Sequence, residues 1–148
     1  MTLDTRIRWL KAASIFTIGF GIVFAAAAIP ALAAPTALFM DMVFFPLDGA
    51  PGIGDPAARL LLAVTGGVLA GWALMVYLVV TEVVPKDPAT GRRLILVSLA
   101  AWYIVDSSMS FAAGAPVNVA SNTVFLLLFV VPAWSLDASG NAVSAGAN

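Results

Sequence analysis

Cysteine and histidine are both absent from this 148-residue chain. Without cysteine there can be no disulfide bonds, thiolate metal sites or thiol catalysis. Without histidine the chain lacks the commonest general base, imidazole ligation of haem and most zinc sites. No phosphate-binding glycine loop, nucleophile elbow or HExxH motif occurs either. We therefore predict a protein without catalytic residues, bound metal or cofactor.

Charged residues are also scarce, at 10% of the chain against roughly 25% in soluble domains. The net charge is −1, and no basic patch is interleaved with aromatic residues, so nucleic acid is not an expected partner. Hydrophobic residues make up 61% of the sequence. A soluble core of this size cannot bury so much apolar surface, so the composition predicts a protein of the lipid bilayer.

Four apolar segments reach the length of about 20 residues that a helix needs to cross a bilayer. They lie at about 12–34, 60–81, 94–113 and 117–136. Gly114 can end the third helix in a left-handed conformation, and Pro116 suits the first turn of the fourth. We predict an all-α fold, a four-helix transmembrane bundle forming one domain over residues 1–136. The small polar residues of 137–148 predict a mobile tail.

The first segment also has features of a secretory signal peptide. Arg6, Arg8 and Lys11 precede an apolar run that ends in "ALAAP", a sequence with small residues at the spacing of a cleavage site. The apolar run is longer than the usual 7–15 residues of such a peptide. We therefore predict a retained membrane helix.

Basic residues predict the orientation. Six of the seven basic residues lie before the first helix or between the second and third, and only Arg59 lies on the other side. The positive-inside rule then places both termini in the cytoplasm, and we expect a bacterial cytoplasmic membrane. The loop at 35–56 faces outward in this topology. It is half apolar, which favours a segment that lies at the membrane interface or folds over the bundle as a lid.

One carboxylate, that of Asp106, interrupts the third helix. Asp106 and Ser110 are four residues apart and share a helix face, as do Asn118 and Asn122 on the fourth helix. In a hairpin folded at Gly114, Asp106 and Asn122 are each eight residues from the turn. They should therefore lie at the same depth, roughly 12 Å from the turn at about 1.5 Å per residue. We predict an intramembrane polar site formed by Asp106, Ser110, Asn118, Asn122 and Tyr103.

The energetics leave two interpretations of this site. An aspartate at the centre of a membrane helix costs about 2.5–3.5 kcal/mol, and interhelical hydrogen bonds return on the order of 0.6 kcal/mol each. The polar residues would then only fasten the hairpin. Alternatively, they line a small polar cavity, open to the outer side, that binds a proton, a cation or a ligand head group. Ionisable residues inside a membrane favour such a functional interpretation.

Small residues at four-residue spacing allow close contact between membrane helices. The second helix has Gly67 and Gly71, and the first has Gly21 and Ala25. We predict that these residues pack the first two helices together. The alternative is that they mediate self-association or docking onto a larger membrane complex.

These features lead to one leading function and two alternatives. The leading prediction is a non-enzymatic structural or accessory subunit of a membrane assembly, with the lipid bilayer and either further copies or a larger complex as partners. The first alternative is a binder or transporter of a small ligand, proton or cation that uses the site around Asp106. The second is a membrane enzyme in which Asp106 transfers a proton.

Overall fold

The computed structural model describes residues 1–49 and 52–136, and these residues form helices without any strand. The elements are α1 (Leu3–Ala26), a 3₁₀ turn η1 (Pro30–Leu32), α2 (Ala34–Val43), α3 (Pro56–Leu78), a π-helical segment η2 (Val79–Val83), α4 (Pro88–Ala112) and α5 (Pro116–Ala133). Four of these helices, with α3 and η2 counted as one span, are long and apolar enough to cross a membrane. This confirms the all-α class and the four spans. The predicted tail at 137–148 lies outside the described residues.

The helices begin earlier than the apolar runs predicted. Thr2, Asp55 and Asp87 cap α1, α3 and α4, and each side chain accepts a hydrogen bond from a backbone N–H of the first turn. Such caps satisfy donors that have no partner within the helix. Hydropathy marks only the part of a helix suited to lipid, so it missed these polar first turns.

The end of the first span was also predicted wrongly. Helix α1 ends at Ala26, eight residues before the predicted end at residue 34. Pro30 opens a 3₁₀ turn there, and α2 begins immediately afterwards. Proline lacks the backbone N–H that a continuing α-helix requires. The chain is still apolar at this point, and for that reason the apolar run alone did not reveal the break.

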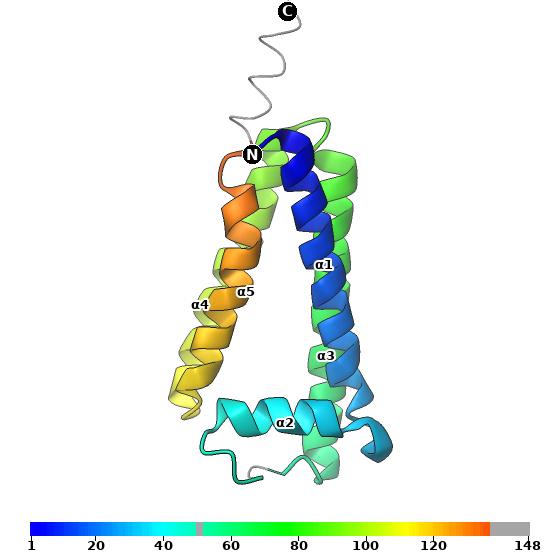
Figure 1. Cartoon of the computed structure of the whole chain (residues 1–148), viewed down its shortest axis with the longest axis vertical. Helices are drawn as coiled ribbons and strands as arrows, with labels where there is room; N and C mark the ends of the chain where they lie inside the picture. The colour runs from blue at the N-terminus through cyan, green and yellow to red at the C-terminus, as the bar shows by residue number, and fades with distance from the viewer. Residues whose placement is uncertain (50–51, 137–148) are drawn as a thin grey trace, which may run out of the picture.

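The spans form two helical pairs that meet at one end and diverge at the other (Figure 1). Helix α1 packs along α3, and α4 packs along α5. The pairs meet near the N-terminus and the α3–α4 connection, and α2 lies across the opposite, divergent end (Figure 1). We call these the closed end and the open end of the bundle.

A hydrophobic core joins the two pairs at the closed end. Its fully buried side chains include Leu10 of α1, Val80 of η2, Leu99 of α4 and Phe129 of α5. Burial of each such side chain is worth about 1.5–3 kcal/mol in water, but lipid is also apolar, so inside a bilayer close packing holds the helices together. The core therefore fixes the closed end and leaves the open end free to diverge.

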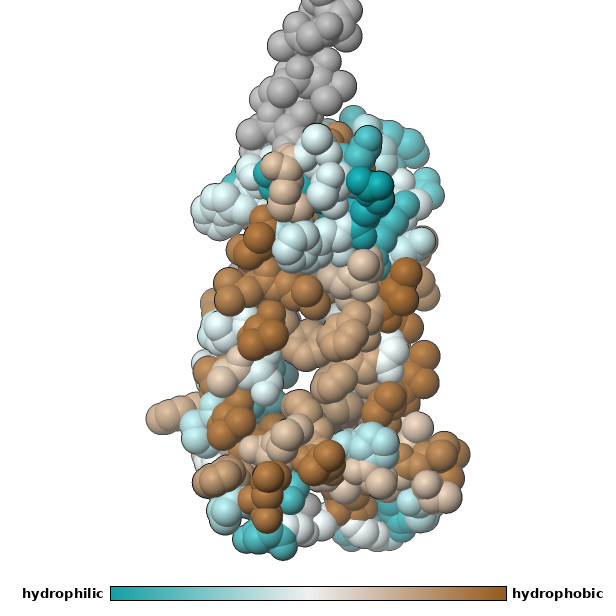
Figure 2. Space-filling model, viewed as in Figure 1, coloured by the Kyte–Doolittle hydropathy of each residue, from teal (hydrophilic) through white to brown (hydrophobic). Residues whose placement is uncertain are grey.

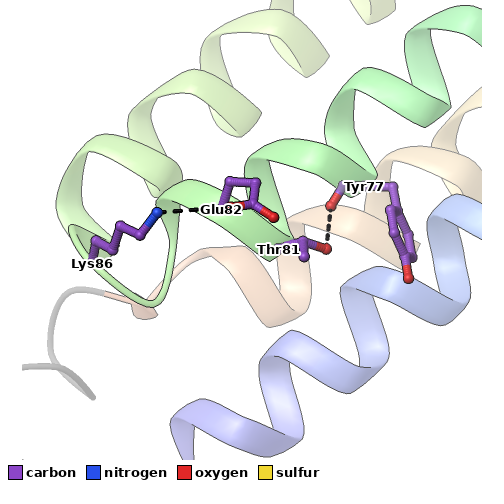
Figure 3. A network of polar contacts seen from close by, with 4 residues as sticks. All are labelled: Tyr77, Thr81, Glu82 and Lys86. Atoms are coloured by element: carbon purple, nitrogen blue, oxygen red, sulfur yellow. Dashed lines mark hydrogen bonds and ion pairs between the residues drawn. The ribbon is translucent and has the colours of Figure 1, made fainter.

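The π-helical segment η2 continues α3 to the closed end, where the chain turns towards α4. The Thr81 hydroxyl donates to the Tyr77 carbonyl oxygen at 2.8 Å, and Lys86 lies 3.7 Å from the Glu82 carboxylate (Figure 3). The Lys11 ammonium of α1 lies 5.7 Å from the centre of the Tyr77 ring. This cation–π contact attaches α1 to the last turns of α3.

The α1–α3 contact does involve small residues, but not all of those predicted. A Cβ added at Gly21 would lie 2.7 Å from the Gly66 carbonyl oxygen and 2.8 Å from the Ala70 backbone nitrogen. A Cβ added at Gly66 would overlap the backbone of Gly21 and Ala25. The backbones of α1 and α3 are thus in direct contact, as expected for small-residue packing.

The predicted role of Gly67 and Gly71 in this contact is wrong. A Cβ added at either glycine would meet no atom within 4 Å, and both residues are exposed. The contacting residues of α3 are Gly66 and Ala70, one position earlier along the helix. A shift of one residue rotates a helical position by about 100°, so Gly67 and Gly71 lie away from α1.

Helix α2 lies across the open end and is attached to α1 and to the segment that follows it. The Thr36 hydroxyl donates to the Val23 carbonyl oxygen at 3.1 Å, and the Phe39 ring lies 5.4 Å from Phe20 and 5.3 Å from Phe24. The Asp41 carboxylate accepts hydrogen bonds from the backbone N–H groups of Asp48 and Gly49. Helix α2, which forms the first part of the half-apolar segment predicted at 35–56, therefore packs across one end of the bundle (Figure 1).

Apolar side chains cover the outside of the bundle between its two ends. Figure 2 shows a broad hydrophobic band on this face, with the hydrophilic residues gathered at the ends. The exposed side chains of this band include Phe16 on α1, Val68 on α3, Ile104 on α4 and Val124 on α5, which are 58–68% accessible. A surface of this kind matches a membrane protein.

Candidate functional site

A tight turn at Gly114 builds the α4–α5 hairpin. Gly114 has a φ of +78°, its N–H donates to the Phe111 carbonyl, and the Ala115 N–H donates to the Ser110 carbonyl. These two bonds and the left-handed glycine make a Schellman motif, which satisfies carbonyl groups at the end of α4. Pro116 then starts α5. The predicted hairpin is confirmed, and it sets the depth of the polar residues on both helices.

Five polar side chains meet inside this hairpin: Asp106, Ser107 and Ser110 of α4, and Asn118 and Asn122 of α5. We call them the polar cluster. Asp106 Oδ1 accepts three hydrogen bonds, from Asn122 Nδ2 at 2.8 Å, Ser110 Oγ at 3.0 Å and Asn118 Nδ2 at 3.3 Å. The pairing of Asp106 with Asn122 that was predicted from their equal distance to Gly114 is confirmed by the first of these bonds.

The amide donors of both asparagines and the Ser110 hydroxyl are used within the polar cluster, whereas several acceptor atoms of the cluster receive no hydrogen bond. Asn118 Nδ2 also donates to Ser110 Oγ at 2.8 Å, and Asn122 Nδ2 donates to Ser107 Oγ at 3.3 Å. Among the hydrogen bonds of the described residues, none reaches Asp106 Oδ2 or the amide oxygen of either asparagine. The polar cluster therefore offers free acceptors to any molecule beside it.

Tyr103 does not join the polar cluster. Its hydroxyl lies 2.9 Å from the Thr123 hydroxyl, and it lines a shallow apolar groove on the α4–α5 pair together with Ile104 and Trp134. That groove does not include Asp106. Tyr103 therefore ties α4 to α5 at a separate place, and its assignment to the same site as Asp106 was wrong.

A cavity of about 660 Å³ lies between the two helical pairs. This volume falls within the range of about 300–1,000 Å³ typical of small-molecule sites. Openings through the middle of the bundle are visible in Figure 2. The polar side chains that line the cavity are Thr65, Ser98, Asp106, Asn118, Ser121 and Asn122.

Aromatic side chains form much of the remaining cavity surface, and we call them the aromatic wall. They are Phe20, Phe24, Phe39, Trp72, Trp102 and Phe125. The wall also bridges the two pairs, because Trp72 of α3 stacks on Trp102 of α4 with ring centres 6.0 Å apart, and Phe20 of α1 lies 5.2 Å from Phe125 of α5. The cavity thus has a polar region towards the open end and aromatic contacts across its width.

The sequence revealed the polar cluster and suggested a small polar cavity beside it, but it did not reveal the aromatic wall or the size of the cavity. The carboxylate and the amides could be placed by counting from Gly114, because both helices follow that one turn. The aromatic wall comes from all five helices, and its position depends on how far the two pairs diverge. The only available sign was the number of aromatic residues within the spans, which is equally typical of a packed core.

The remaining acidic residues at the open end have local structural partners. Asp41 binds two backbone N–H groups, and the Asp55 carboxylate accepts from the N–H groups of Ala57 and Ala58 as the cap of α3. Within the part of the chain that the structure describes, no three acidic side chains gather closely enough to hold a metal ion.

No protein-family model, curated protein or solved structure matches this chain.

Proposed function

We propose that this protein binds a small molecule inside the membrane, in the cavity between the two helical pairs. The observation that carries the proposal is a cavity of about 660 Å³ that places the polar cluster beside the aromatic wall. An apolar site with a few converging polar groups is the usual form of a ligand pocket. Hydrogen bonds within the hairpin alone would not require α1 and α3 to stand apart from α4 and α5.

A comparison of two alanine positions tests this function. Ala101 lines the cavity, whereas Ala120 is exposed on α5 and lines neither the cavity nor the outer groove. The substitution A101F fills the cavity, and A120F adds the same side chain elsewhere. Purified wild-type protein and A120F should release a small molecule on organic extraction, detected by mass spectrometry at near-equal molar ratio to protein. A101F should lack that molecule.

Two results would contradict this function. One is a wild-type protein that releases no small molecule under conditions where its fold is intact. The other is a molecule retained by A101F at the wild-type ratio, since the cavity would then not be its site. Far-ultraviolet circular dichroism of both variants establishes that the helices are retained.

We propose the accessory role as a second candidate, because Gly67 and Gly71 form an exposed small-residue face of α3 with open space at each Cα. Such a face allows a further helix to approach closely. In this role Gly67→Leu would block assembly, and Asp106→Asn would leave it intact. Native mass spectrometry of the protein extracted from membranes would compare the two variants, and unchanged assembly of Gly67→Leu would contradict the role.

The proposed setting is a bacterial cytoplasmic membrane with both termini in the cytoplasm. The closed end, which carries the N-terminus and the α3–α4 connection, would face the cytoplasm, and α2 would face outward. We propose a non-enzymatic role, since the cavity lining contains one carboxylic acid and no histidine, lysine or cysteine that would activate its hydroxyl groups or act as a nucleophile.

A further inference from the structure

We propose that the ligand of the cavity is an amphipathic cation, with a primary ammonium group on an apolar body. This inference rests on the proposed binding function and specifies its ligand class. The first argument is charge. Asp106 is the one acidic side chain among the residues that line the cavity, and no lysine or arginine lines it. An anionic ligand would meet a carboxylate with no compensating base in a region of low dielectric constant.

The hydrogen bonds of the polar cluster give the second argument. Both asparagine amide groups donate to Asp106 and to neighbouring serine hydroxyls, so their N–H groups are already hydrogen-bonded within the hairpin. The second Asp106 oxygen and the two amide oxygens remain as acceptors. An ammonium group carries three donors and no acceptor, and therefore matches this arrangement. A ligand carboxylate or phosphate would need donors that the cluster has already used.

The aromatic wall gives the third argument. Its six rings supply both apolar surface and the electron-rich faces that attract cations. A bare metal ion or a proton would leave most of a 660 Å³ cavity unfilled. An ammonium group beside Asp106, with an apolar body along the aromatic wall, would use both regions at once.

The test compares three probes that share a twelve-carbon chain and differ only in the head group: dodecylamine, dodecanol and dodecanoate. Each is titrated into full-length protein in nanodiscs of a zwitterionic lipid. The change in tryptophan fluorescence is recorded, because Trp72 and Trp102 line the cavity. Wild-type protein, D106N, A101F and A120F are measured side by side. Partitioning of a probe into the lipid is the same for all four proteins, so differences among them report the site.

We expect wild-type protein and A120F to prefer dodecylamine to dodecanoate, and D106N to bind dodecylamine at least about tenfold more weakly. Binding of dodecanol should change less than about twofold in D106N, because its hydroxyl does not need the negative charge. Circular dichroism and thermal unfolding of D106N show whether its fold is retained. Should D106N not fold, the head-group preference of wild-type protein decides the question by itself.

The outcomes separate this inference from the function beneath it. Equal binding of dodecylamine and dodecanoate by wild-type protein, with both lost in A101F, would overturn the ammonium assignment and leave the binding function standing. Unchanged dodecylamine binding in a folded D106N would overturn it as well. Unchanged binding of every probe in A101F would overturn the binding function itself.

Discussion

Asp106 shows at the residue scale how one acid can serve both the fold and a ligand. Its Oδ1 accepts hydrogen bonds from Asn118 and Asn122 of α5 and from Ser110 of its own helix, and none of the hydrogen bonds of the described residues reaches its Oδ2. An asparagine at this position would retain hydrogen bonding at lower cost in a membrane. In the proposed function, an acid at this position provides a partner for a ligand ammonium group, which an asparagine would not.

Asn122 and Asn118 provide a prediction about the hairpin. Asn122 is buried and donates to Asp106 at 2.8 Å, whereas Asn118 is half-buried and its bond to Asp106 is 3.3 Å long. We expect Asn122→Ala to lower the free energy of unfolding by about 1–2 kcal/mol, and Asn118→Ala by less. Denaturation of detergent-solubilised protein, followed by circular dichroism, measures both. A larger loss in Asn118→Ala would contradict this order.

Asp87 provides a prediction about pH at the closed end. The hydrogen bond from the Thr90 backbone N–H, with the Thr90 side chain as a further donor, lowers the pKa of the Asp87 carboxyl below its usual value. A pKa that is lower in the folded than in the unfolded state means that the carboxylate stabilises the fold above the unfolded pKa. This stabilisation is lost as the pH falls through the folded pKa.

Asp87→Ser tests this effect, because serine also caps a helix but does not titrate in this range. Wild-type protein should melt at a higher temperature than Asp87→Ser at neutral pH. The difference should begin to shrink near pH 3.9, the ordinary value for aspartate, and disappear at a lower pH, once the pH has fallen through the lowered pKa of folded Asp87. Thermal melts of both proteins from neutral to acidic pH measure this difference in melting temperature. The other acidic residues are the same in both proteins, so their titration does not contribute to the difference. A difference that is constant with pH would show that the charge of Asp87 does not matter.

At the element scale, the sequence predicted the helices more reliably than their contacts. Four spans and the turn at Gly114 followed from long apolar runs and from one glycine–proline pair. The α1–α3 contact was predicted one residue out of phase, because Gly66, Gly67 and Gly71 are equally small. Spacing alone does not say which of them faces α1. Only the partner backbone decides, and Gly21 and Ala25 contact Gly66.

The adjacent glycines of α3 form a matched pair for a prediction. Gly66→Ala would place a methyl group against the backbone of α1, and Gly67→Ala would place it in open space. We expect Gly66→Ala to lower the free energy of unfolding by about 1–3 kcal/mol, as for other overpacked sites, and Gly67→Ala to leave it unchanged or slightly raised. Chemical denaturation in a common detergent compares them. Equal stabilities would mean that α1 and α3 are not in backbone contact.

At the scale of the whole molecule, the cavity results from unequal packing at the two ends. Large side chains pack the pairs together at the closed end, and Gly21, Gly66 and Ala70 bring the backbone of α1 onto that of α3. Between α3 and α4, by contrast, Trp72 stacks on Trp102 with ring centres 6.0 Å apart, so bulky rings meet where α1 and α3 place glycine against glycine. The divergence of the two helical pairs depends on the sizes of side chains from several helices at once. A sequence analysis that treats each apolar segment separately could not predict it.

Orientation in the membrane is the last prediction, and the absence of cysteine makes it directly testable. Single cysteines can be introduced at Leu47, near the open end, and at Ala89, in the first turn of α4 at the closed end; both residues are exposed. Neither substitution removes a basic residue, so the charge distribution that sets the orientation is preserved.

A maleimide that cannot cross membranes is then added to intact bacterial spheroplasts. Leu47→Cys should be labelled at once and Ala89→Cys only after lysis, and unmodified protein supplies the unlabelled control. Labelling of Ala89→Cys before lysis would invert the topology, so that α2 and the polar cluster would lie towards the cytoplasm.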